Sequence, residues 1–117
     1  MTVKFFIAGG TLKIHKTAYA QEMLIQKSVL RSLLCWRSAG DLSNQHPLID
    51  EADNDGMITI HFNNTEAVHL GEDPGELLGA LKKKYRKKVK GRITCRGYMS
   101  SFTISLDSDD GEIQYIM

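Results

Sequence analysis

The sequence is poor in the residues and patterns that mark several classes of protein. Of its 117 residues, only two are cysteine and two are proline. Cys35 and Cys95 are too few and too far apart for a disulfide framework or a four-ligand zinc site, so both are expected to be reduced thiols in the core. No apolar run approaches the roughly 18 residues of a membrane span, and the N-terminal apolar run is shorter than the about 7 to 15 residues of a secretion signal. These absences predict a cytoplasmic protein without a membrane span.

Motifs for catalysis and cofactor binding are also missing. The pair Gly9 and Gly10 lacks the second glycine before Lys-Ser/Thr that a phosphate-binding loop requires. Residues 51–58 resemble the first half of a calcium loop, but Phe62 stands where a bidentate glutamate is needed. The histidines supply no evident third ligand for a metal site. We therefore expect no metal, no cofactor and a non-enzymatic role. The open alternative is an active site formed by residues that are distant in the sequence and come together only in the fold.

Acidic residues are absent from one strongly basic stretch. Residues 82–92 contain eight of the fifteen lysines and arginines and no aspartate or glutamate. Outside this window seven basic residues stand against fourteen acidic ones, so the net charge of +1 conceals a local +8 and a remainder of −7. Such asymmetry is typical of a surface that binds a phosphate-rich partner, and also of a solvated helix face.

The residues that are present predict an α+β fold in a single domain, residues 1–117. Short hairpin links outnumber long crossovers, which favours a two-layer structure with a mainly antiparallel sheet of five to seven strands and two helices, in the order ββαββαβββ. The expected strands are 3–7, 11–15, 57–62, 67–70, 92–99, 102–106 and 112–116. The expected helices are 18–38 and 74–90, and 41–55 is expected to be a surface loop.

The second predicted helix carries the basic stretch. Asp73 is a suitable N-cap, and Pro74 suits the first helical position. One face is apolar and should pack on the core, through Leu78, Leu81, Tyr85 and Val89. Four cation pairs at i and i+4 should together cost on the order of 1 to 2 kcal/mol. Either the acidic stretches 50–55 and 107–112 offset this cost, or a polyanionic partner does.

Two functional hypotheses follow. The first is a small binding module whose cationic helix face contacts an acidic macromolecule such as nucleic acid. The expected contact residues are Lys82, Lys83, Arg86, Lys87, Lys90, Arg92, Arg96 and Tyr98. The alternative is a protein–protein regulator of the inhibitor or immunity type, or a subunit of a β-mediated homodimer, because the apolar residues 113–116 suit a sheet edge.

Overall fold

The computed structural model describes residues 6–34, 48–62, 73–97 and 99–117. Its strands are β1 (Phe6–His15), β2 (Leu48–Ile49), β3 (Met57–His61), β4 (Val89–Gly97), β5 (Ser100–Ser105) and β6 (Gln114–Ile116). Its helices are α1 (Lys16–Leu24), α2 (Val29–Leu34), α3 (Pro74–Tyr85) and the short 3-10 helix η1 (Arg86–Lys88).

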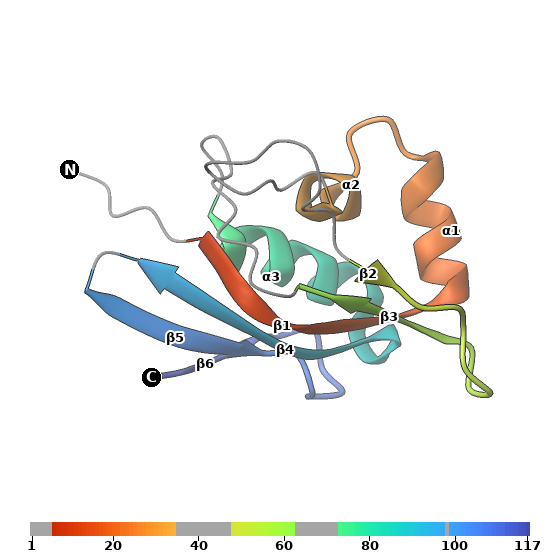
Figure 1. Cartoon of the computed structure of the whole chain (residues 1–117). Coiled ribbons are helices and arrows are strands. Elements are labelled where there is room, and N and C mark those ends of the chain that lie inside the picture. Colours follow the sequence, from red (N-terminus) through yellow and green to blue (C-terminus); the bar gives the residue numbers. More distant parts are fainter. Residues whose placement is uncertain (1–5, 35–47, 63–72, 98) are drawn as a thin grey trace.

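The six strands form one antiparallel sheet in the order β2-β3-β1-β4-β5-β6. Figure 1 shows α1, α2 and α3 on one side of this sheet, where they form the second layer. The predicted two-layer, antiparallel α+β architecture is therefore confirmed. None of the helices in the described part of the chain has the length and apolarity to cross a bilayer.

Alternation along the strands separates the core from the face of the sheet that no described helix covers. On β1 and β4 the buried side chains are Ile7, Leu12, Ile14, Val89, Ile93 and Cys95. The intervening positions on the opposite face include Thr11, Lys13, Arg92 and Thr94. A register slip of one residue would expose the whole apolar set, so burial fixes the pairing.

The first predicted hairpin is wrong, because β1 runs without a turn through Gly9 and Gly10. The two glycines instead lie at and beside a β-bulge, which shifts the register against β4 between Ile7 and Gly9. Gly10 has φ +109°, and a Cβ there would lie 2.3 Å from the carbonyl oxygen of Arg92. Gly10 therefore permits a close approach of β4, which the sequence pattern does not distinguish from a turn.

The first predicted helix is also divided, into α1 and α2. Ser28 begins α2, since its Oγ accepts a hydrogen bond from the N–H of Arg31 at 3.2 Å. The same hydroxyl donates to the buried carboxylate of Glu22 at 3.0 Å. The break between α1 and α2 therefore gives the carboxylate of Glu22 a hydrogen bond from Ser28, which a continuous helix would not provide. Residues 35–38 of the predicted helix lie outside the described part.

The second predicted hairpin is confirmed only for its first strand, β3. The predicted second arm, residues 67–70, lies outside the described residues. The predicted surface loop contributes Leu48 and Ile49 to the sheet as β2, which pairs with β3. The hairpin of β5 and β6 forms as predicted.

The basic helix begins as predicted and ends early. The carboxylate of Asp73 accepts a hydrogen bond from the N–H of Gly75 at 3.2 Å, and Pro74 occupies the first turn. The α-helix stops at Tyr85, Arg86 has φ +51°, and β4 already starts at Val89. The predicted end near Lys90 is therefore wrong, and several of the cations lie beyond the α-helix.

Candidate functional site

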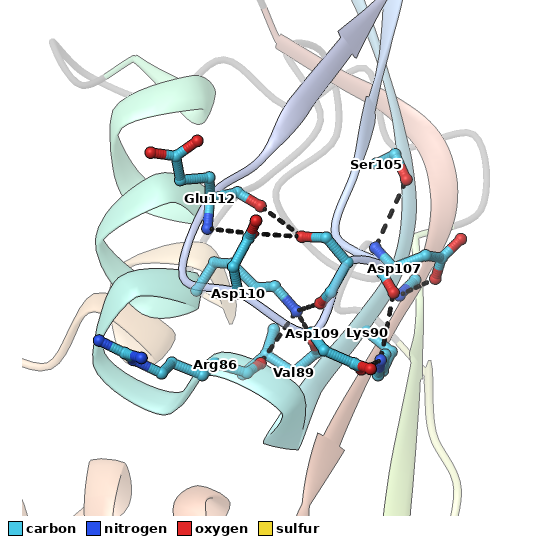
Figure 2. A network of polar contacts seen from close by, with 11 residues as sticks. Arg86, Val89, Lys90, Ser105, Asp107, Asp109, Asp110 and Glu112 are labelled. Carbon is cyan, nitrogen blue, oxygen red and sulfur yellow. Dashed lines mark hydrogen bonds and ion pairs between the residues drawn. The ribbon is translucent and has the colours of Figure 1, made fainter.

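Lys82 was predicted to lie on the exposed helix face, but the structure buries it completely. Its ammonium donates hydrogen bonds to three backbone carbonyls, those of Arg86 at 2.9 Å, Val89 at 2.7 Å and Ser108 at 2.5 Å. These bonds belong to the network in Figure 2. Ser108 lies in the connection between β5 and β6, residues 107–112, which we call the acidic loop.

The burial of Lys82 follows from the packing of the acidic loop against α3. A Cβ at Gly111 would lie 3.3 Å from the Cα of Lys83, so the loop and the helix are in direct contact. Helical periodicity identifies the side of α3 that faces the sheet, but it gives no sign of this second covered side. Sequence reasoning therefore assigned a structural lysine to the binding surface.

The environment of Lys82 still favours an ammonium with a structural role. Burial lowers its pKa, and repulsion from Lys90 lowers it further, whereas Asp109, Asp110 and Asp107 act in the opposite direction. An ammonium has three N–H donors, and three carbonyls accept them. Lys82 thus joins the end of α3, the start of β4 and the acidic loop, and no donor remains for a ligand.

The acidic loop neutralises the cations at the start of β4. Lys90 Nζ lies 2.5 Å from Asp109 Oδ1 and donates to the carbonyl of Asp107 at 3.1 Å (Figure 2). Asp107 also accepts from Arg92 Nε and from the N–H of Gly91, each at 3.1 Å. The intramolecular alternative, in which residues 107–112 offset the basic stretch, therefore holds for Lys90 and Arg92.

Charge and hydrogen bonding hold the carboxylates of this loop in the ionised state. The hydrogen bond from Lys90 and its charge lower the pKa of Asp109. Burial raises the pKa of Asp107, but hydrogen bonds from Gly91 and Arg92 outweigh it, so the pKa lies below its ordinary value. Asp110 accepts from the hydroxyl of Ser108, and this bond lowers the pKa of Asp110.

The acidic stretch 50–55 forms no ion pair with the basic stretch in the described structure. Asp53 caps its own turn, accepting from the N–H groups of Asp55 and Met57 at 2.9 Å each. Asp50 lies 2.8 Å from Nε2 of His61. Among the described residues this stretch therefore offers the basic stretch no direct ion pair, and its contribution is limited to Asp53 and Asp55, which line a depression together with Lys90 and Arg92.

Four cations remain outside the acidic network, and we call them the basic cluster: Lys83, Arg86, Lys87 and Lys88. All four side chains are exposed. Within the described residues, no carboxylate lies within 4.0 Å of their charged groups. The carbonyl of Arg86 accepts from Lys82 (Figure 2), and the stem of its side chain lies beside the acidic loop, since a Cβ at Gly111 would lie 3.7 Å from its Cγ.

The predicted contact residues therefore divide into separate groups. Lys83, Arg86 and Lys87 lie together in the basic cluster, and Lys88, which the sequence reasoning omitted, joins them. Lys90 and Arg92 contact the acidic loop. Lys82 is buried, Arg96 lies farther along β4, and Tyr98 is outside the described residues.

A depression of about 470 Å³ lies beside this region, on the face of the sheet opposite the helices. Its lining residues are Thr11, Lys13, Asp53, Asp55, Met57, Lys90, Gly91, Arg92 and Asp107. Three cations face three carboxylates there, so the depression carries no net formal charge. It does not by itself select an anion.

A buried network at Glu22 accounts for the remaining lysine of α3. The carboxylate of Glu22 accepts from Tyr85 at 2.5 Å and from Lys84 at 2.9 Å, in addition to Ser28. Burial raises the pKa of Glu22, but hydrogen bonds from Lys84, Tyr85 and Ser28 outweigh it and leave the pKa below its ordinary value. This network joins α1 to α3, and sequence reasoning missed it because Glu22 carries no motif.

The thiol and the metal candidates give no further site in the described part of the chain. Cys95 is buried, and burial raises its pKa to about 12, so the thiolate that would act as a nucleophile does not form near neutral pH. No group of three potential metal ligands occurs among the described residues. Cys35, His46 and His69 lie outside them. No family model, curated protein or solved structure matches the chain.

Proposed function

We propose that the protein binds an acidic macromolecule, specifically nucleic acid, through the basic cluster of Lys83, Arg86, Lys87 and Lys88. The observation that carries this proposal is the selective pairing around the cluster. The adjacent acidic loop pairs with Lys90 and Arg92, yet within the described residues it leaves these four exposed cations without an ion pair. A phosphate backbone supplies anions at a spacing that several neighbouring cations can contact together.

The local charge also favours a polyanion. The eight cations of residues 82–92 outnumber the four carboxylates of the acidic loop and that of Glu22 by three positive charges. Each phosphate that the cluster neutralises releases condensed counterions, so binding gains free energy at low salt. Long lysine and arginine side chains contact phosphates without reading base edges, so we expect little sequence preference.

The double substitution Lys83→Glu/Lys87→Glu tests this function. We expect it to weaken binding of a labelled oligodeoxynucleotide at least about tenfold at about 50 mM salt, because two phosphate contacts become repulsive. Wild-type affinity should fall steeply between about 50 and about 200 mM salt, with a shallower slope for the variant. Fluorescence anisotropy measures both quantities, on single-stranded and duplex probes of equal length.

The matched control is Lys16→Glu/Lys27→Glu, which makes the same charge change at exposed lysines outside residues 82–92 and outside the depression beside Lys90. An equal loss in this control would show that only net charge matters. Absence of wild-type binding at low salt would refute the proposed function.

The outer strand β6 supports a second candidate function, a homodimer through the sheet edge. In the described structure β6 pairs only with β5. Tyr115 and Ile116 are 54% and 44% exposed, and residues 113–117 contain no charge or proline. Such an edge lacks the usual protection against pairing with a second strand. The β6 strands of two copies carry no charged side chains and would pair without side-chain repulsion.

Ile116→Lys tests this second candidate, because it places two like charges at the proposed interface. We expect wild-type protein to dimerise independently of salt, and the variant to raise the dimer dissociation constant at least about tenfold. Sedimentation equilibrium measures the change. Met117→Lys adds the same charge one residue beyond the strand and should dimerise more tightly than Ile116→Lys; a wild-type monomer at all concentrations would contradict the candidate.

A further inference from the structure

We infer that the acidic loop is a built-in competitor of the polyanion, with the carboxylate of Asp109 occupying the position on Lys90 that a phosphate takes in the complex. This inference rests on the proposed function and concerns the regulation of the same surface. It adds Lys90 to the binding surface as a contact that becomes available only when the side chain of Asp109 turns away.

The first step in the argument is the position of Lys90. Lys90 is the second residue of β4, and β4 begins directly after η1, which ends at Lys88. The charge of Lys87, a member of the basic cluster, acts on Asp109, so the cluster lies close enough to the Asp109–Lys90 pair for one polyanion to reach both. Lys90 differs from the cluster in its partners, which are Asp109 at 2.5 Å and the carbonyl of Asp107 at 3.1 Å.

The second step is the difference between the carboxylates of the loop. Asp107 is fixed by the N–H of Gly91 and by Arg92, and Asp110 by the Ser108 hydroxyl and by the loop backbone. The side chain of Asp109 is 84% exposed, and among the described residues its only hydrogen bond comes from Lys90, with weaker electrostatic attraction from Lys82 and Lys87. Asp109 can therefore rotate away from Lys90 without disturbing the other contacts.

The third step is the anchoring of the loop backbone. Lys82 does not bind Asp109 or a phosphate, because its three N–H donors are bound to carbonyls inside the fold. The bond to Ser108 keeps the loop against α3 whether or not Asp109 contacts Lys90. Displacement consequently requires only a change of side-chain rotamer at Asp109, and the competitor stays close to the cluster.

Asp109→Asn tests the inference by removing the charge of the competitor and keeping its shape. We expect about 1.5- to 5-fold tighter binding of a labelled oligodeoxythymidylate at about 50 mM salt, the range of one exposed ion pair. The salt slope should steepen by about 0.7, since Lys90 becomes free to neutralise one more phosphate of a single strand. Adding Lys90→Gln to this variant should cancel both changes.

The control is Glu76→Gln, which removes the same charge from the first turn of α3, at the other end of the helix from the basic cluster. A gain specific to Asp109→Asn supports the inference, as does binding by this variant alone. Wild-type binding with no gain in Asp109→Asn, or with an equal gain in Glu76→Gln, overturns the competition and leaves the proposed function standing. Failure of both wild type and Asp109→Asn to bind overturns both.

Discussion

Replacing Lys82 with methionine should lower the free energy of unfolding by about 2 to 5 kcal/mol. Methionine fills most of the volume of the lysine stem but donates no hydrogen bond. The carbonyls of Arg86, Val89 and Ser108 each lose a charged donor, and the loss occurs at a side chain with no exposed surface. Urea denaturation followed by circular dichroism measures the difference from the midpoint and the slope.

The neighbouring Lys83→Met is the matched control, because it makes the same chemical change at an exposed position. Its effect on stability should stay within about 0.5 kcal/mol. Equal effects of the two substitutions would show that Lys82 is not the anchor of the acidic loop. The two variants should also separate in binding: only Lys83→Met removes a member of the basic cluster.

Replacing Glu22 with glutamine should cost about 1 to 3 kcal/mol of stability at neutral pH, because a buried carboxylate that accepts from Tyr85 and Ser28 is lost. Lys84 contributes little to this figure, since its side chain is 45% exposed and water screens its charge. Thermal or urea unfolding measured at a series of pH values tests the size of the effect.

The pH dependence of the Glu22→Gln effect has a definite sign. The pKa of Glu22 in the folded state lies below the ordinary value of 4.5, so its ionised form stabilises the fold. That contribution is fully present above 4.5 and is lost as the pH falls through the folded-state pKa. Glutamine resembles the protonated acid, so the stability difference between wild type and variant should narrow on acidification. A difference that stays constant down to the acid transition would contradict this assignment.

The same two networks explain how the protein tolerates a run of like charges on α3. Lys82 donates to backbone carbonyls, and Lys84 pairs with Glu22. Two of the eight cations are therefore used inside the fold, and the acidic loop offsets Lys90 and Arg92. Some repulsion remains between Lys82 and Lys90, where it lowers the pKa of Lys82, and the rest falls on the basic cluster, which is the surface proposed for nucleic acid.

Several features of the fold follow from neighbouring residues and were predictable. Asp73 and Pro74 start α3 because a capping carboxylate and a preset backbone angle act within one turn. The antiparallel pairing of β5 and β6 across a short connection is equally local, although Gly111 lacks the positive φ of a two-residue Asp-Gly turn. Strand and helix periodicity likewise gave the antiparallel α+β class.

The position of the local charge was visible in the sequence, but its availability was not. Which cations are free depends on the acidic loop, and Ser108 lies 26 residues from the lysine that it anchors. The early end of α3 and the unbroken β1 have the same origin, since Lys82 and Gly10 meet partners from other elements.

The sequence by itself determined the class of fold, the cap of the basic helix and the excess of cations in residues 82–92, because each depends on contacts within a few residues. Only the tertiary structure decided that Lys82 is buried, that Glu22 accepts from Tyr85 across 63 residues, and that four exposed cations remain unpaired among the described residues. The physical reason is that burial and ion pairing depend on which distant segments pack together, and helical periodicity carries no information about the second segment that covers α3.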